Sequence, residues 1–503
     1  MEVMVALTAW VASFACRNVG ISARFESICS QDGHGHRLED ILFQGAAVYL
    51  PGSEGFTEAT TRWSSLYAPN LTLVVSPSVE DDVAKTVQYA NEKDLPFLVV
   101  NGGHGAIKTV GALHNGIGIW MNRLSSVEIL EDDSTAKFGG GTLSKIITDT
   151  LWAAGKQTVT GGCECTSLLG PGLGGGHGFL QGRHGLISDQ FVSMNVVLAN
   201  GSLTTVSATS NPDLWWGLQG AGHNFGIVTS VTSKIYPVQY PDWAYVSFIY
   251  LGDKVEALYA AINDHLLKGG SQPVDIINYS FFFSSPDIDP TKPVIMFYIL
   301  QEGVTAVDSA YTSPFYDLDP ITTAAEGGSY TDLPAWTGNA LESPPCQKSG
   351  LVNMRFPIDL ESYDIAAQRK VYDLFAQAFQ DTPALNGSLF LFEGYSLQGI
   401  RAVPSESTAY PFRNDNLLIA PLITYAPGGP ELDNQAVELG EKLRQVLYEA
   451  SGRTERHTYV NYAYGDESQR NWYGYEEWRQ TKLEQLKNTY DPKRRLSFYA
   501  PIA

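Results

Sequence analysis

Two glycine-rich segments each hold side chains that are able to bond to a ligand. In the first, Asn101–Gly105, His104 stands between glycines, and in the second Cys163 is followed by the triplet Gly174–Gly176 and then by His177. Because glycine has no side chain, main-chain N–H groups in such segments can lie close against a flat or phosphorylated ligand. An imidazole and a thiol in these positions can then bond to that ligand.

The elements before the first segment follow an alternating pattern of strand and helix. A short β-branched run, 71–75, and a buried apolar run, 95–100, are expected to be strands, and the second ends at the His104 segment. A helix is expected between them at 79–90, with Ser78 as its N-cap and acidic residues in the favoured first turn.

The second segment follows a helix expected at 143–154, which ends a few residues before Cys163. Two further strands are expected at 191–199 and 203–206, joined by a turn at Asn200. Beyond about 240 the pattern changes to aromatic and β-branched strands with helices between them, which indicates an antiparallel sheet with helical cover. The clearest of these elements are 244–250, 294–300, 364–379, 388–392 and 417–425.

Together the two segments resemble the flavin-attachment sites of the berberine-bridge-enzyme-like oxidases, a branch of the vanillyl-alcohol-oxidase superfamily with a PCMH-type FAD-binding fold. In that family a histidine and a cysteine each tether the isoalloxazine ring of FAD, and His104 and Cys163 match those positions. The triplet Gly174–Gly176 begins 11 residues after Cys163, the interval that the family shows after its bonded cysteine. The resemblance therefore selects Cys163, and not Cys165, as the thiol that bonds to flavin.

The resemblance also implies which other residues bind FAD. His104 would bond to the 8α-methyl carbon and Cys163 to C6, while the neighbouring backbone would receive the pyrophosphate. The remaining cofactor-binding residues implied are Asn101, Gly102, Gly103, Gly105, Gly162, Gly174, Gly175, Gly176, Gly226, Ile227, Val228 and Asn461.

Two residues are candidates for removing a proton from the substrate. His177 occupies the position at which plant relatives place a tyrosine base, and a histidine accepts a proton near neutral pH more readily than an unperturbed tyrosine. Its alternative role is bonding to the FAD phosphate or to backbone. Tyr462 matches the second tyrosine of the family's C-terminal Tyr-x-Asn-Tyr, which shapes the substrate pocket, and its alternative role is filling the core.

Two further positions affect the expected chemistry. Thr166 stands where the family places a residue that controls access of oxygen to the flavin, and its small size favours an oxidase. The run 418–422 matches a strand that supplies a polar residue facing the flavin in plant relatives, yet it holds no polar side chain here. We therefore expect the partner that tunes the base to be absent and the pocket to prefer an apolar substrate.

The resemblance implies an α+β fold of two lobes with the ligand between them. A signal peptide is expected at 1–15, an FAD-binding domain at 45–238 and a substrate domain at 239–455. The segment 456–503 is expected to return to the FAD-binding lobe.

Composition excludes several classes of partner. A formal net charge of -21 would be repelled by nucleic acid and by anionic membranes, so a small molecule is the expected partner. No apolar run reaches the roughly 18 residues that a membrane span requires. No Cys/His spacing resembles a zinc site, so no metal is expected.

The N-terminal apolar run 3–16 resembles the core of a secretory signal. Sequons at Asn70, Asn200, Asn278 and Asn386 would accept glycans on a secretory route. We therefore expect a secreted protein, with a cytoplasmic location as the alternative.

These features predict an FAD-dependent oxidase of a small organic substrate, with hydride transfer to flavin N5 and O2 as acceptor giving hydrogen peroxide. The amino-acid sequences of the glycine segments are most similar to those of filamentous-fungal members, many of which act on secondary metabolites. An oxidative cyclase is the alternative enzyme. An alternative from another functional class is a secreted binding protein that carries flavin and has little turnover.

Overall fold

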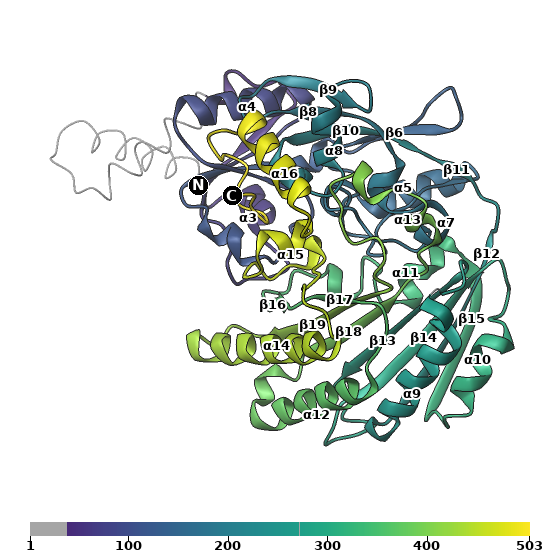
Figure 1. Cartoon of the computed structure of the whole chain (residues 1–503). Helices are drawn as coiled ribbons and strands as arrows, with labels where there is room; N and C mark the ends of the chain where they lie inside the picture. Colours follow the sequence, from purple (N-terminus) through teal and green to yellow (C-terminus); the bar gives the residue numbers. More distant parts are fainter. Residues whose placement is uncertain (1–37, 271) are drawn as a thin grey trace, which may run out of the picture.

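The computed structural model describes residues 38–270 and 272–503 of the 503-residue chain. The expected signal peptide at 1–15, together with Cys16 and Cys29, lies outside these residues. Figure 1 shows two lobes, the first built from the N-terminal half together with the C-terminal segment and the second from the middle of the chain. The expectation of a two-lobe α+β fold is confirmed.

The first lobe contains a four-stranded sheet in the order β1-β2-β4-β3, in which β2 and β3 both run parallel to β4. Its strands are β1 (Ala47–Tyr49), β2 (Leu71–Ser76), β3 (Phe97–Val100) and β4 (Gly116–Trp120). β3 ends directly before the loop that carries His104. The strand positions His104 because the loop leaves its carboxyl end.

Helix α4 (Glu80–Glu92) follows β2 and packs its apolar face on this sheet. Its N-cap is Val79, so the expectation that Ser78 caps the helix is wrong. The carboxylate of Asp82 instead accepts hydrogen bonds from the backbone N–H groups of Ser78 (2.9 Å) and Val79 (3.1 Å). The acidic side chain at the third position of the helix therefore accepts from the backbone N–H of the N-cap residue, as the N3 residue of a capping box does.

A second, antiparallel sheet of the first lobe has the order β5-β6-β10-β8-β9. Its strands are β5 (Val127–Ile129), β6 (Thr135–Gly139), β8 (Phe191–Val197), β9 (Leu203–Ser207) and β10 (Ile227–Lys234). The helices of this part include α5 (Ser144–Ala153), α6 (Leu169–Gly172), α7 (Gln181–His184) and α8 (Pro212–Leu218). The Cys163 loop lies between α5 and α6, and Gly226 precedes β10.

The second lobe is built on an eight-stranded antiparallel sheet, as expected, in the order β15-β12-β14-β13-β18-β19-β16 with β17 paired to β19. Its strands are β12 (Asp242–Tyr250), β13 (Ile276–Phe283), β14 (Val294–Glu302), β15 (Thr322–Ser329), β16 (Val352–Arg355), β17 (Ile358–Leu360), β18 (Leu389–Gly394) and β19 (Leu417–Tyr425).

The two faces of this large sheet have different neighbours. Helices α9 (Val255–Ala261), α12 (Ile365–Asp381) and α14 (Pro430–Ala450) cover the face away from the first lobe (Figure 1). Side chains on the other face, including Tyr279 and Leu418, belong to the same buried core as the first lobe. This face of the sheet therefore packs against the first lobe.

The C-terminal segment returns to the first lobe, where α15 (Gln469–Tyr473) and α16 (Glu477–Tyr490) lie in Figure 1. The amide of Asn224 donates to the carbonyl of Ala500 (3.0 Å), and the buried ammonium of Lys487 donates to the carbonyl of Asn224 (3.0 Å). These contacts fix the segment that also carries Tyr462.

A buried arginine ties α14 to this segment. The Arg444 guanidinium donates to Glu467 (2.7 Å) and Asp466 (3.0 Å), and both Arg444 and Glu467 are buried. The Glu467 carboxylate also accepts from the backbone N–H groups of Tyr464 (3.1 Å) and Gly465 (2.7 Å). The network therefore holds the turn that follows Tyr462.

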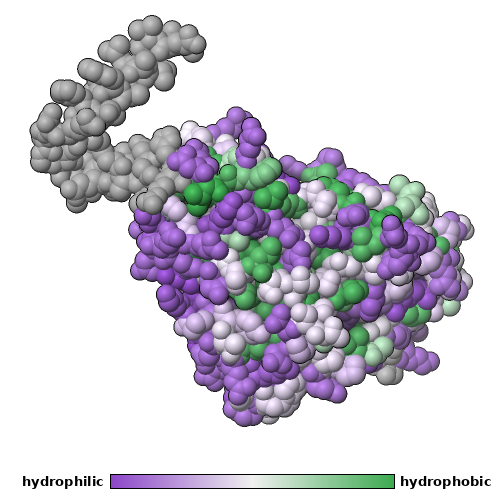
Figure 2. Space-filling view, turned by 90° about the horizontal axis from the view of Figure 1, so that it is seen from above, coloured by the Kyte–Doolittle hydropathy of each residue, from purple (hydrophilic) through white to green (hydrophobic). Residues whose placement is uncertain are grey.

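The face of the molecule drawn in Figure 2 is mainly hydrophilic. Figure 2 shows one face on which hydrophobic residues form scattered patches between polar ones. Among the described residues, no helix combines the length and apolar character that a membrane crossing needs.

The Arg444 network generates a stability prediction. Arg444→Met leaves the buried Glu467 carboxylate without its cation and should lower the free energy of unfolding by about 3–5 kcal/mol. Arg456→Met is the matched control, because Arg456 is partly exposed and lies 3.5 Å from Glu441, a carboxylate that also pairs with Arg444. That variant should cost less than about 1 kcal/mol in urea titrations. Equal losses in both variants would contradict the assigned role of the buried pair.

Candidate active site

His104 lies in the loop after β3 with one ring nitrogen free. Its Nε2 is 3.1 Å from the carbonyl oxygen of Pro345, which can only accept a hydrogen bond, so Nε2 carries the proton and donates. Its Nδ1 is buried and has no partner. Burial lowers the pKa of His104 to about 4, so the ring is neutral at physiological pH. Nδ1 therefore keeps a free lone pair.

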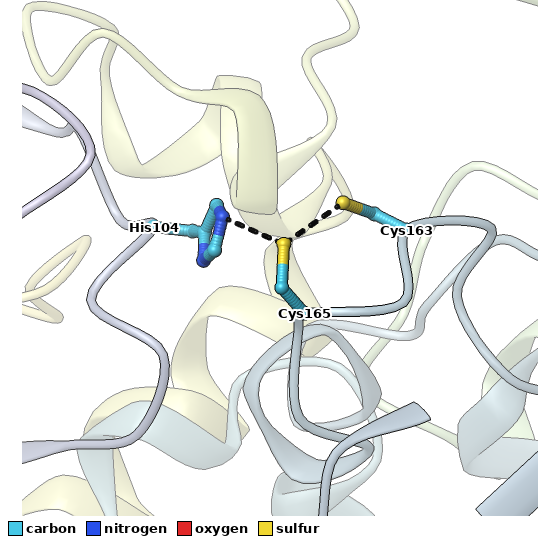
Figure 3. A group of neighbouring side chains, drawn as sticks. All are labelled: His104, Cys163 and Cys165. Carbon is cyan, nitrogen blue, oxygen red and sulfur yellow. Dashed lines mark hydrogen bonds between the residues drawn. The ribbon is translucent and has the colours of Figure 1, made fainter. Parts of the chain in front are cut away.

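Three cysteines meet beside this histidine. Cys165 forms a disulfide with Cys346, while Cys163 is the free cysteine of the described residues. Figure 3 shows His104 on one loop and Cys163 and Cys165 on the other, with the three side chains directed toward one another. Their ligating atoms lie within 4.8 Å of one another. The disulfide removes the Cys165 sulfur as a thiolate metal ligand, which leaves Cys163 as the available thiol.

Glycines line the site where side chains would collide. A Cβ on Gly102 would lie 2.8 Å from the carbonyl oxygen of Cys165, and one on Gly174 would lie 2.4 Å from Oδ1 of Asn461. The backbone there therefore has no room for larger residues, as a close cradle for a ligand requires. The other residues expected to bind a cofactor lie in the same loops (Asn101, Gly103, Gly105, Gly162, Gly175, Gly176) or at the start of β10 (Gly226, Ile227, Val228).

Tyr462 contacts a buried carboxylate across the two lobes. Its hydroxyl donates to Oε1 of Glu393 (2.8 Å), while Oε2 of Glu393 accepts from the hydroxyl of Tyr395 (2.7 Å). The hydroxyl of Tyr279 hydrogen-bonds to that of Tyr395. Burial raises the pKa of Glu393 above its ordinary value, and the hydrogen bonds from the tyrosines oppose this shift. Tyr462 is half-buried, whereas Glu393 is buried.

An arginine stacks on the same tyrosine. The Arg355 guanidinium lies 4.3 Å from the centroid of the Tyr462 ring and 4.5 Å from that of Trp63. Such a position places positive charge against the electron-rich ring face.

A polar partner for Tyr462, one of the two candidate bases, comes from a strand other than the expected one. The run 418–422 on β19 is apolar as its sequence shows, but Glu393 on the neighbouring strand β18 pairs with Leu418 in register. Leu391 and Glu393 share one face of β18 because side chains alternate along a strand, and Leu391 packs against the core shared with the first lobe. This alternation is the signal that could have identified Glu393 from the sequence.

Both ring nitrogens of His177 have hydrogen-bond partners. Nδ1 lies 2.9 Å from Oε1 of Gln181, and Nε2 lies 3.0 Å from the hydroxyl of Tyr410. Burial lowers the pKa of His177 to about 4, which keeps the ring neutral. Nδ1 then donates to Gln181 and Nε2 accepts from Tyr410. A role for His177 as the substrate's base stays a prediction, and the structure shows no free ring nitrogen for it.

Asn461 and Thr166 bond to the protein itself. The amide of Asn461 donates to the carbonyl of Pro171 (2.9 Å) and to the hydroxyl of Tyr459 (2.7 Å). The hydroxyl of Thr166 donates to the carbonyl of Cys163 (2.9 Å). Both contacts fix the loops around the site, and the effect of Thr166 on oxygen access stays a prediction.

Comparison with known proteins identifies the family. An FAD binding domain model matches residues 71–207. The FAD-linked oxidoreductase chyH of Penicillium rubens is 52% identical over 503 residues, which is 100% of both chains. The FAD-linked oxidoreductase chry5 of Gibberella zeae is 49% identical over 497 residues, 96% of this chain and 98% of the relative. The chain belongs to the FAD-linked oxidoreductases.

Solved structures show the same fold for this FAD-linked oxidoreductase. Xylooligosaccharide oxidase from Myceliophthora thermophila C1 in complex with xylobiose superposes with a TM-score of 0.78 at 20% identity, covering 94% of this chain and 98% of that one. Physcomitrella patens BBE-like 1 gives a TM-score of 0.76 at 20% identity, covering 94% and 99%. The expected resemblance of the fold to that of the berberine-bridge-enzyme-like, PCMH-type oxidases is confirmed.

The residues of the site fit FAD, an anionic cofactor. Arg62, Lys348 and Arg355 surround His104 closely enough to lower its pKa, and none of them has a carboxylate ion-pair partner among residues 38–270 and 272–503. Buried atoms without partners, Oδ1 of Asn101 and Nδ1 of His104, lie in the same loop. Unpaired positive charge and free acceptors beside a glycine cradle are what a pyrophosphate and a flavin ring need.

His223 of this FAD-linked oxidoreductase generates a pH prediction. Its Nε2 donates to the carbonyl of Gly170 (2.9 Å), and burial lowers its pKa to about 4. The unfolded chain takes up this proton near its ordinary pKa of 6.5 and the folded chain does not, so stability falls as the pH drops from 6.5 toward 4.

His223→Gln should therefore lose about 2 kcal/mol less unfolding free energy between pH 7 and pH 4.5 than the wild type does. The wild type, measured in parallel, provides the reference. Urea titrations at both pH values measure the difference. The assignment fails if His223→Gln follows the wild-type curve.

Proposed function

We propose that this FAD-linked oxidoreductase oxidises a small organic alcohol or amine, with Tyr462 and Glu393 accepting the O–H or N–H proton. When bound, FAD accepts a hydride from the substrate C–H at N5 and is reoxidised by O2 to give hydrogen peroxide. The hydrogen bond between Tyr462 and Glu393 is the observation that carries the proposal.

The proton path runs through the tyrosine to the carboxylate. Burial holds the pKa of Tyr462 well above its ordinary value, so this hydroxyl stays protonated and passes a proton on. The substrate gives its proton to Oη of Tyr462 as the hydroxyl proton moves to Oε1 of Glu393. The raised pKa of Glu393 suits it to this task, because a base works best when its pKa lies near the working pH.

Arg355 supports this transfer electrostatically. Negative charge develops on Oη of Tyr462 while the proton moves, and the guanidinium over the ring stabilises that charge. Arg355 is thus a positioning residue for Tyr462.

The flavin is proposed to be held at two points, by Nδ1 of His104 and the thiol of Cys163. Nδ1 of His104 is a ring nitrogen without a hydrogen-bond partner, and Cys163 is the free cysteine among residues 38–270 and 272–503. Each attachment would form a C–N or C–S bond in place of a flavin C–H bond, and the protein would lose the proton of Nε2 of His104 or of the Cys163 thiol. Two protons and two electrons leave in each case, and O2 accepts the electrons.

The sheet face beside the site favours an aromatic substrate. Tyr279 and Tyr298 stack with ring centroids 5.3 Å apart on this face, and Tyr245 stacks on Trp336 at 5.9 Å. Flat rings and hydroxyl groups together match a flat molecule with a few polar groups.

We further propose that the protein is secreted. The disulfide between Cys165 and Cys346 is typical of oxidising compartments. Asn70, Asn200 and Asn386 are exposed and accessible to glycosylation, but Asn278 is buried and donates to Gln272 (2.6 Å). Asn278 is therefore excluded as a glycan acceptor of the folded chain.

Anaerobic reduction of the flavin tests the function. We expect a panel of benzylic alcohols and cyclic aromatic amines to contain a compound that bleaches the enzyme's flavin absorbance, with hydrogen peroxide released when oxygen is admitted. Xylobiose serves as the carbohydrate control. Reduction by xylobiose alone would contradict the proposed preference for an aromatic substrate, and flavin that stays oxidised throughout would favour a binding protein. Product analysis separates oxidation from oxidative cyclisation.

Two variants test the proton path. Tyr462→Phe and Glu393→Gln should each slow flavin reduction by about 10²- to 10⁴-fold, as loss of a general base does. The control is Tyr250→Phe, because the buried Tyr250 donates to the carbonyl of Phe315 (2.7 Å) and belongs to the core on the opposite side of the sheet. Its reduction rate should stay at the wild-type level. Wild-type rates in Glu393→Gln would contradict the proposed path.

The pH dependence separates catalysis from folding. The reduction rate should rise with pH through the raised pKa of Glu393, and this rise should vanish in Glu393→Gln. The folded chain holds this proton more tightly than the unfolded chain, so ionisation of Glu393 costs stability as the pH rises above about 4.5. Glu393→Gln should therefore keep or raise the melting temperature at neutral pH. A lower melting temperature would indicate a structural role.

A further inference from the structure

The three sulfurs beside His104 lie in mutual contact. Sγ of Cys163 is 3.4 Å from Sγ of Cys165 and 3.5 Å from Sγ of Cys346. The disulfide joins Cys165 of the first lobe to Cys346 of the second across 181 residues of sequence. Any two of the three cysteines are therefore close enough to form a disulfide after small side-chain rotations.

Each alternative pairing would consume the thiol of Cys163. In one route, the Cys163 thiolate attacks one sulfur of the disulfide and the other sulfur leaves as a thiolate, with no net oxidation. In the other, two free thiols lose two protons and two electrons to a disulfide-containing oxidant, which is reduced to two thiols. In either product, Cys163 has no thiol left for another bond.

Backbone contacts hold Cys346 against Cys165. The backbone N–H of Glu164 donates to the carbonyl of Asn339 (3.0 Å), and its carboxylate accepts from the backbone N–H of Leu341 (2.8 Å). Glu164 stands between Cys163 and Cys165 in sequence, so the same residue that spaces the two cysteines anchors the segment 339–346. These hydrogen bonds therefore favour the pairing of Cys165 with Cys346.

The observed geometry also slows exchange. Sγ of Cys163 lies at nearly equal distances from the two sulfurs, beside the S–S bond, whereas displacement needs an approach along the axis of that bond. Burial raises the pKa of the Cys163 thiol, and the thiol form is a poor nucleophile. The disulfide therefore stays with Cys165 and Cys346 once it has formed.

We propose that the Cys165–Cys346 disulfide protects the thiol of Cys163, so that this thiol remains available for flavin, and that it closes before the flavin bond forms. The inference rests on the proposed attachment of flavin to Cys163. Cys165 and Cys346 are then positioning residues for the attachment, and they take no part in oxidation of the substrate.

Single and double replacements of the two cysteines test this order. Cys346→Ser leaves Cys163 beside the thiol of Cys165, and Cys165→Ser leaves it beside the thiol of Cys346. In each single variant we expect Cys163 to enter a disulfide and the fraction of chains with flavin on Cys163 to fall about tenfold or more. The double variant Cys165→Ser/Cys346→Ser has no competing thiol, and its Cys163-bound flavin should recover to the wild-type level.

The variants are compared by peptide mapping with mass spectrometry. Free thiols are first blocked with iodoacetamide, and the disulfides are not reduced. The map reports the partner of every cysteine and the flavin on His104 and Cys163 independently of activity. Flavin retained on His104 shows that a variant has folded. Single variants with wild-type levels of Cys163-bound flavin would overturn the proposal, as would a folded double variant without it.

If the single variants do not fold, the peptide map of the wild-type protein still tests the proposal. Every wild-type chain with flavin on Cys163 should also carry the Cys165–Cys346 disulfide. Chains with flavin on Cys163 and with Cys165 and Cys346 both alkylated would overturn the protective role alone. A wild-type map with Cys163 alkylated and no flavin on it would instead overturn the proposed attachment, and the protective role with it.

Discussion

The meeting of His104 and Cys163 is the constraint on which the rest of the site depends. The two residues are 59 positions apart and lie on different loops, yet their ligating atoms lie within 4.8 Å of one another. A strand end positions the first loop and a disulfide anchors the second, while glycines keep the surrounding backbone close. The second lobe takes part directly, because Pro345 fixes the tautomer of His104 and Cys346 binds Cys165.

The same two lobes meet again at Tyr462 and Glu393, where the chemistry is proposed to take place. Tyr462 comes from the C-terminal segment, held by the buried Arg444 network, and Glu393 comes from a central strand of the large sheet. A neutral tyrosine above a buried carboxylate, with Arg355 on its ring, is arranged to move a proton with little exposure of charge to water. The candidate cofactor-binding residues and the proposed proton acceptor are thus placed by one interface between the lobes.

The sequence predicts the local features of this site well. The glycine segments around His104 and Cys163 are short motifs whose meaning depends on nearby residues, and the strands of the second lobe follow a clear alternating pattern. Glu393 was missed because the resemblance directed attention to 418–422, while the carboxylate arrives from the neighbouring strand. The register between β18 and β19 places Glu393 beside Leu418, and the alternation along β18 determines the face on which its side chain lies.

Two further features depend on tertiary packing. The pairing of Cys165 with Cys346 spans 181 residues, and an odd number of cysteines does not specify which of them remains free. His177 was a reasonable base by residue type, but its environment comes from Gln181 on α7 and from Tyr410, which is 233 residues away. A hydrogen-bond partner so far away along the chain cannot be recognised from the sequence around His177.

The most direct measurement is the absorbance of acid-precipitated protein from the wild type, His104→Ala, Cys163→Ala and the double variant. A flavin held at both residues predicts a yellow pellet from the wild type and from each single variant, and a colourless pellet from the double variant alone. Wild-type flavin that washes into the supernatant would contradict attachment at both residues and would leave only a dissociable FAD site.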